Sequence, residues 1–279
     1  MNNTFAFNRF KNLLLKDGKK YFRNFGTALI VFCCLNAIFW IFNLLFGSET
    51  NAVTRFGFLC IWTALAMMLV PEKVYGKANL SREGVGFAMM PASSLEKFIS
   101  MFIYCAIVTP VIVFFGGFLV DTLLSLFPFG GFEKSIHLYS INEIARMMND
   151  HSGVAQFGEA TVNFTDVFSI GAMRTSLYLN IIQWAAIFML GNMLFKKHKA
   201  GKTFACYLGI SYLLSTVFGG IMFANPDRID QWWQSIKKLS DVELIHLWQN
   251  AMTWSLVFSI IVTLVLLYFT YRKIKTQKY

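Results

Sequence analysis

Long stretches without a charged residue alternate along this chain with shorter, charged stretches. A helix that crosses a bilayer needs roughly 20 apolar residues, and five of the uncharged stretches reach that length. A sixth, at 56–71, is shorter, but it extends back to 52 if the Arg55 side chain snorkels towards the membrane surface. The pattern therefore predicts an all-α integral membrane protein with six transmembrane helices, at 24–48, 52–71, 98–120, 175–195, 203–226 and 247–271.

The overall composition agrees with a membrane protein. Of the 279 residues, 56% are hydrophobic and 14% are charged, whereas soluble domains carry about 25% charged residues. Neither an internal repeat nor a low-complexity linker divides the sequence, so we expect a single membrane domain, 1–279. All five cysteines fall inside predicted spans, where we expect them to pack as small apolar residues.

The distribution of charge predicts the orientation of the spans. With six spans, the N-terminal stretch, 72–97, 196–202 and the C-terminal tail share one side of the membrane. These segments hold 18 of the 25 Lys and Arg residues but only 4 of the 15 acidic residues. The positive-inside rule then places both termini in the cytoplasm. The net charge of +10 thus reflects topology and attraction to anionic membrane lipids, and it indicates no nucleic-acid partner.

The first 23 residues mix aromatic and Leu side chains with Lys and Arg at helical spacing. We interpret 1–23 as an amphipathic helix that lies in the inner membrane interface. The alternative is a basic leader that only sets the topology. Under the first interpretation, the interfacial anchors are Phe7, Arg9, Phe10, Lys11 and Leu14.

Two sizeable segments fall on the outer, extracytoplasmic side. Residues 121–174 are enough for a small domain or a pair of interfacial helices. Residues 227–246 follow Pro226 and are amphipathic and rich in Trp, which favours an interfacial or re-entrant helix.

Catalytic and metal-binding patterns are missing from the sequence. Apart from Arg55, the predicted spans contain no Asp, Glu, Lys, Arg or His, which disfavours an ion-coupled carrier. The four histidines fit no standard metal-ligand spacing, so we predict no metal site. Gly201-Lys202-Thr203 resembles the end of a phosphate-binding loop, but Lys196 stands where the first glycine belongs. We therefore expect no catalytic residues, no cofactor and no ATPase activity in this chain.

The predicted cytoplasmic loop 72–97 is the remaining candidate for a functional site. Ser93-x-x-Glu96 is a capping box that predicts a helix start leading into the third span, and Pro91 favours a break just before it. Upstream, 82–90 is apolar enough for a short helix with Phe87, Met89 and Met90 partly exposed. An ordinary turn between two spans is the alternative.

This loop resembles the coupling region of type-two ABC exporter permeases, six-helix subunits whose ATPase is a separate chain. The resemblance rests on Arg82-Glu83-Gly84, on the apolar Phe87 to Met90, on Pro91-Ala92-Ser93 and on Leu95-Glu96-Lys97. The chain departs from the common pattern in having Val85 after the glycine, Met90 before the proline and a long 121–174 segment.

The resemblance implies a permease in the bacterial cytoplasmic (inner) membrane that forms a homodimer or heterodimer with another permease. A separate ATP-binding subunit would bind ATP and Mg²⁺ and dock on the helix at about Ser81–Met90. The residues implied in coupling are Arg82, Glu83, Gly84, Phe87, Met90, Pro91, Ser93, Glu96 and Lys97. The alternative is a membrane scaffold or receptor that transports nothing and binds a partner through its outer segments. The sequence does not select a substrate.

Overall fold

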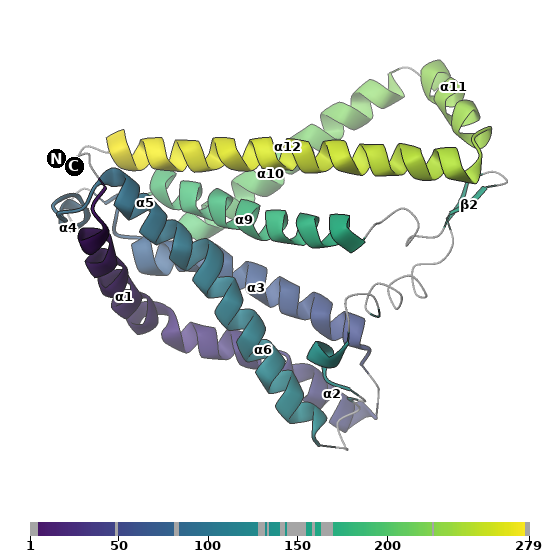
Figure 1. Cartoon of the computed structure of the whole chain (residues 1–279). Helices are drawn as coiled ribbons and strands as arrows, with labels where there is room; N and C mark the ends of the chain where they lie inside the picture. Colours follow the sequence, from purple (N-terminus) through teal and green to yellow (C-terminus); the bar gives the residue numbers. More distant parts are fainter. Residues whose placement is uncertain are drawn as a thin grey trace. The chain divides into compact units, whose positions relative to one another are not determined.

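The computed structural model describes residues 5–47, 50–80, 84–127, 132, 134–139, 143, 155–157, 160–162, 170–224 and 226–276. These residues fall into two compact units (Figure 1). The first unit holds Met1–Tyr139, Asn180–Thr203 and Ile261–Tyr279, and the second holds Ser140–Leu179 and Phe204–Ile260.

Every predicted span lies mostly in helix. In chain order, the main helices are α1 (Phe7–Cys34), α2 (Ala37–Phe46), α3 (Ala52–Tyr75), α5 (Ser94–Phe102), α6 (Thr109–Ser125), α9 (Ile170–Leu194), α10 (Lys199–Phe223) and α12 (Asp241–Thr276). Within the described residues, five helical stretches are long and apolar enough to cross a membrane: Phe7–Phe46, Ala52–Tyr75, Ser94–Ser125, Thr175–Leu194 and Val242–Thr276. The structure is thus a helical protein with five candidate spans, and the predicted span 203–226, which lies mostly in α10, is not among them.

Helix α1 does not stop where the predicted interfacial helix ends. It runs without a break from Phe7 to Cys34, and the chain turns at Leu35 and Asn36 before α2 begins. Residues 7–23 and the first part of the predicted span 24–48 therefore form one helix. The stretch around Arg23 and Asn24 contains no proline, and Gly26, two residues after Asn24, weakens the helix without ending it.

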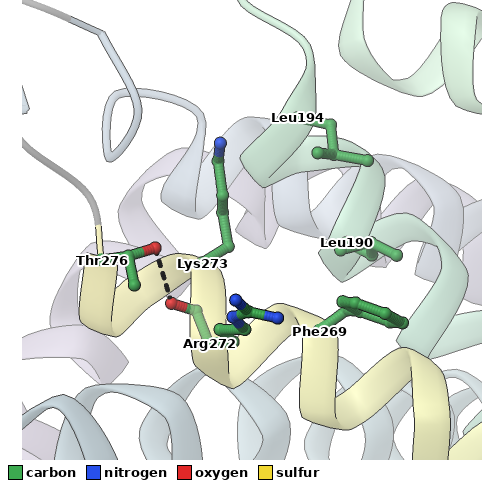
Figure 2. Close-up of a pocket in the computed structure, with 6 residues that line it drawn as sticks. All are labelled: Leu190, Leu194, Phe269, Arg272, Lys273 and Thr276. Atoms are coloured by element: carbon green, nitrogen blue, oxygen red, sulfur yellow. Dashed lines mark hydrogen bonds between the residues drawn. The ribbon is translucent and has the colours of Figure 1, made fainter.

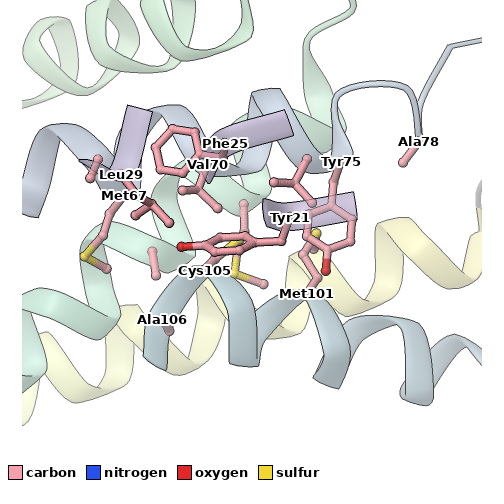
Figure 3. Close-up of a cluster of buried hydrophobic side chains, with 14 of the residues drawn as sticks. Tyr21, Phe25, Leu29, Met67, Val70, Tyr75, Ala78, Met101, Cys105 and Ala106 are labelled. Atoms are coloured by element: carbon pink, nitrogen blue, oxygen red, sulfur yellow. The ribbon is translucent and has the colours of Figure 1, made fainter. Parts of the chain in front are cut away.

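The core of the first unit lies where α1, α3 and α5 meet. Tyr21, Phe25 and Leu29 of α1 pack beside Met67 and Val70 of α3, with residues of the third predicted span on the other side (Figure 3). The three α1 residues recur at i and i+4, which places them on one face of the helix. The large side chains on the outside of these helices, such as those of α2, remain exposed and apolar, as suits contact with lipid.

A π-helical turn, η1 (Ile103–Val108), joins α5 to α6 within one continuous helical stretch. The Thr109 amide donates to the Tyr104 carbonyl, and the Thr109 hydroxyl donates to the same oxygen at 2.7 Å. Pro110 lacks a backbone N–H, so one hydrogen bond of the helical ladder is missing at this residue. The wider π turn lies directly before this missing bond. Hydropathy did not reveal this element, because the stretch is apolar throughout.

Arg55 does not snorkel, which corrects the sequence-based prediction. Its side chain is buried, and Nη1 pairs with Asp121 Oδ1 of α6 at 2.6 Å. Nη2 donates to the Lys134 carbonyl at 2.8 Å, and the guanidinium lies 4.1 Å from the Phe132 ring centroid. Asp121 Oδ2 in turn accepts from the Ile136 amide at 2.8 Å, in the 3-10 helix η2 (Ile136–Leu138). A buried charge needs such partners, and this pair ties α3 to α6.

The second unit contains helix α11 (Pro226–Lys237) and the first part of α12. The predicted outer helix 227–246 is thus divided, and Ser240 and Glu243 form the break: the Ser240 amide and hydroxyl donate to Glu243 Oε2 at 3.0 and 2.8 Å. A small antiparallel hairpin, β1 (Ala155–Phe157) with β2 (Ala160–Val162), departs from the all-helical prediction. Most of the remainder of 121–174 lies outside the described residues.

Candidate functional site

The candidate site lies at the end of the first unit where the C-terminal end of α3 leads into the loop before α5. Figure 1 shows helix α4 (Val85–Ala88) of this loop at the same end of the unit as the start of α1 and the C-terminal end of α12. The prediction that the loop contains a short helix is therefore met, although this helix has only four residues. Ser81, Arg82 and Glu83 lie outside the described residues, so the structure does not place the two charged residues of the predicted coupling motif.

The predicted capping box is present at the start of α5. Ser93 has an extended backbone, its Oγ accepts from the Glu96 amide at 3.2 Å, and Glu96 Oε2 accepts from the Ser93 amide at 2.8 Å. Both exchanged hydrogen bonds satisfy backbone donors that the first turn of a helix leaves unpaired. Pro91 precedes the cap in a bend, as predicted, so the helix that leads into the third predicted span has a fixed start.

Glu96 has a second set of partners that the sequence did not indicate. Its other carboxylate oxygen, Oε1, accepts from the Ala6 amide at 2.8 Å and from Arg9 Nη2 at 3.1 Å. The Glu96 side chain is fully buried. One carboxylate therefore joins the start of α1 to the start of α5, and it faces inward rather than towards an incoming partner.

Lys97 holds α4 against the rest of the unit. Its ammonium donates to the Phe87 carbonyl at 2.7 Å and to the Ala88 carbonyl at 3.1 Å. These two carbonyls end the short helix, where a cation is favourable. The same ammonium lies 5.2 Å from the Phe87 ring centroid, a distance typical of a cation–π contact. A four-residue helix is too short to be stable alone, so we attribute its order to Lys97 and to the burial of Phe87.

The exposed face of α4 differs from the one predicted. Phe87, expected to be partly exposed, is buried in the core, and Met90 is half-buried against it. Met89 is exposed as predicted, to 78%, and Val85 and Gly86 are exposed beside it. The correction follows from helix geometry, because residues 85, 86 and 89 share one face while residue 87 points to the opposite side. Gly84 is buried and Pro91 is exposed.

Asp17 forms a polar contact on α1 that the sequence analysis missed. Its Oδ2 accepts from Ser100 Oγ at 2.6 Å and from the Tyr75 hydroxyl at 3.2 Å, and the side chain is buried. It therefore links α1, α3 and α5. A signal was available in the sequence, because Leu13, Asp17 and Tyr21 recur every four residues and so share the buried face of the helix. Directly after Asp17, Gly18 leaves the space in which the Tyr104 hydroxyl reaches the Leu14 carbonyl.

The connection between α9 and α10 is bonded to the same loop. Asn79 Nδ2 donates to the carbonyls of Met193 and Phe195, at 3.1 and 2.7 Å. Lys199 donates to the Gly76 carbonyl and to Asn79 Oδ1. Burial lowers the pKa of Lys199 to about 8, and the Glu72 carboxylate opposes this shift. The basic segment 196–202 is therefore partly structural rather than wholly solvated.

The predicted interfacial anchors divide between the two faces of α1. Arg9 pairs with Glu96, and Phe10 and Leu14 are half-buried. Phe7 and Lys11 are exposed, Phe7 to 69%. An amphipathic helix is thus present, while its contact with a membrane surface stays a prediction.

Within the described part of the chain, no three His, Cys, Asp or Glu side chains are close enough together to hold a metal ion. His137 Nδ1 lies 2.8 Å from Ser135 Oγ and 3.0 Å from Thr122 Oγ1, both of which also take part in contacts around Asp121.

The chain matches no protein-family model, no curated protein and no solved structure.

Proposed function

We propose that this chain is the membrane-spanning permease subunit of an ATP-driven exporter and that helix α4 is its contact with a separate ATPase. The observation that supports the proposal is the exposed face of α4. Val85, Gly86 and Met89 offer a small apolar surface to a partner, and the helix behind them is fixed by Phe87 and Lys97. A docking element that transmits movement needs this combination of an open surface and a rigid base.

The bonds around α4 provide a route for movement into the spans. Lys97 belongs to α5, and α5, η1 and α6 form one helical stretch from Ser94 to Ser125. Displacement of α4 would therefore act directly on this stretch. Glu96 would carry the movement to α1 through Arg9, and Asn79 would carry it to the end of α9. The π turn η1 is a weaker point in the stretch at which its two halves can bend.

The proposal includes an arrangement in the membrane. The five candidate spans and α10 cross the bilayer six times, and α4 and both termini face the cytoplasm by the positive-inside rule. The membrane is the bacterial inner membrane. The permease pairs with a second copy or a related permease, while the separate ATPase binds ATP and Mg²⁺. This chain has no catalytic role of its own.

A matched pair of substitutions tests the coupling surface. Met89→Glu places a charge on the exposed face of α4, and Leu138→Glu makes the same change at an exposed apolar residue of η2. The two sites lie near opposite ends of α3, because η2 is bonded to the Arg55–Asp121 pair. We expect the ATPase to co-purify with the wild type and with Leu138→Glu but not with Met89→Glu. ATP hydrolysis in vesicles should follow the same order.

Two further variants separate the permease from its rival, a membrane scaffold or receptor without transport activity. Gly84→Trp fills a buried position at the start of α4, and Pro91→Ala loosens the bend before α5. Both should reduce ATPase turnover in the assembled complex. If Met89→Glu, Gly84→Trp and Pro91→Ala all leave ATPase binding and turnover unchanged, the coupling role is refuted and the scaffold becomes the better explanation.

A further inference from the structure

A cavity of about 270 Å³ lies between α9 and the C-terminal end of α12, inside the first unit. Figure 2 shows its two kinds of lining. Leu190 and Leu194 of α9 and Phe269 of α12 form an apolar side, while Arg272 and Lys273 stand at the opposite side. The sixth lining residue, Thr276, donates its hydroxyl to the Arg272 carbonyl at 2.9 Å, so that hydroxyl is occupied within the helix.

The cations stand at the end of a candidate span rather than in its middle. The span Val242–Thr276 ends within one turn of Arg272 and Lys273, and both side chains are exposed. Lys196 and Lys197 follow the end of α9 closely and are exposed as well. Positive charge therefore gathers where the helices leave the apolar region, while Leu190 and Phe269 lie deeper along the same two helices. That order of polarity matches a membrane lipid, whose phosphate lies at the surface above its acyl chain.

We propose that this cavity binds an anionic phospholipid, independently of whether the chain is a permease. The phosphate lies between Arg272 and Lys273, which both donate charge-assisted hydrogen bonds. The first part of an acyl chain lies against Leu190, Leu194 and Phe269. Charge complementarity favours this occupant. A zwitterionic lipid carries an additional cation, which the two neighbouring basic side chains repel. A protein segment in the same cavity would need an acidic group beside an apolar anchor.

Lipid retention in native mass spectrometry tests the cationic side. The protein is reconstituted with mixed phosphatidylglycerol and phosphatidylcholine, then extracted, and the bound lipids are counted. The test variant is Arg272→Gln with Lys273→Gln. The control is Lys19→Gln with Lys275→Gln, which removes two exposed charges that do not line the cavity. Because a hydrogen bond to a charged group contributes about tenfold or more, loss of both should lower the affinity for phosphatidylglycerol about 100-fold in the test variant. The control should retain wild-type affinity.

A second variant tests the apolar side without changing charge. Leu190→Trp fills the cavity, and it should also lower retention of phosphatidylglycerol. Glycerol phosphate and inorganic phosphate are the competing probes, and neither should displace the bound lipid, since they lack the acyl chain. The proposal is overturned if the two double variants lose lipid equally, if phosphatidylcholine is retained as well as phosphatidylglycerol, or if the small phosphates displace the lipid and Leu190→Trp has no effect.

Discussion

The Glu96 carboxylate and the Arg9 guanidinium lie 87 residues apart in the chain and form an ion pair of 3.1 Å. The same carboxylate caps α5 through the Ser93 amide and accepts from the Ala6 amide. One side chain thus fixes the starts of two helices at the end of the unit that carries α4. If α4 receives force from a partner, Glu96 determines that α1 and α5 move together.

Replacing Glu96 with Gln should destabilise the protein, because the amide loses the charge that attracts Arg9 and retains only part of the capping bonds. We expect a loss of about 1.5–3 kcal/mol, the usual range for a charged hydrogen bond. A double-mutant cycle with Arg9→Gln, followed by chemical unfolding in detergent, should give a coupling energy of at least 0.5 kcal/mol, roughly the lower limit for residues in contact. Additive effects of the two substitutions would contradict the ion pair.

Removing one partner of the buried pair Arg55–Asp121 should destabilise the protein more than removing one partner of the Glu96–Arg9 pair. Arg55→Met leaves the Asp121 carboxylate buried without its guanidinium partner, and we expect a loss of about 3–5 kcal/mol. The double variant Arg55→Met with Asp121→Leu removes both charges and should be more stable than Arg55→Met alone. The midpoint of denaturant unfolding provides the measurement. Arg23→Met, at an exposed arginine, is the control and should change little. A loss in the double variant equal to the sum of the two single losses would refute the pairing.

Lys199 should make stability depend on alkaline pH. Burial lowers its folded-state pKa to about 8, while the unfolded chain keeps the ordinary value of 10.5. Between these values the folded state loses its proton first, so the unfolded state binds more protons and the free energy of unfolding rises with pH. The burial cost of the charged amine is present in full below about pH 8. Between pH 8 and 10.5, wild type should therefore gain stability relative to Lys199→Met.

The matching control for that measurement is Lys202→Met, at an exposed lysine on the same helix. Other Lys, Tyr and Cys side chains titrate in this range in all three proteins, and the comparison cancels their contribution. Parallel pH profiles for wild type and Lys199→Met would show that Lys199 keeps an ordinary pKa.

Replacing each of two buried asparagines with leucine should change the stability of the protein in opposite directions. Among the described residues, the Asn36 side chain has no hydrogen-bond partner for either its oxygen or its nitrogen. Its backbone is right-handed helical, which Leu adopts without strain. Asn36→Leu should therefore stabilise the protein by about 1–3 kcal/mol, the cost of a buried unsatisfied group.

Asn43 provides the comparison, because its Oδ1 accepts from the Thr50 hydroxyl at 2.6 Å. Asn43→Leu should cost about 1 kcal/mol through the lost hydrogen bond. Thermal unfolding of both variants in the same detergent is the measurement. A destabilised Asn36→Leu would indicate instead that the Asn36 side chain forms a hydrogen bond in the membrane-embedded protein.

The sequence by itself determined the features that depend on neighbouring residues. The helical stretches follow from runs of apolar residues, and the start of α5 follows from Ser93 and Glu96, which are three residues apart and bond to each other within one turn. The short helix before Pro91 and the helix that begins at Pro226 are local in the same sense. Hydropathy and helix-capping residues describe short segments of the chain, and they were sufficient to predict these local helices.

Only the tertiary structure decided which faces meet. Hydropathy cannot distinguish a core face from a lipid-facing one, because both are apolar. The sequence analysis therefore expected Phe87 to be exposed together with Met89, whereas only Met89 is exposed and Phe87 is buried. The partners of Arg55 and Asp17, and the partners of Glu96 outside its own capping box, lie 58 to 90 residues away along the chain. Whether a charge snorkels, pairs or caps depends on which helix packs beside it. That choice is made by packing across the whole unit, and no local pattern records it.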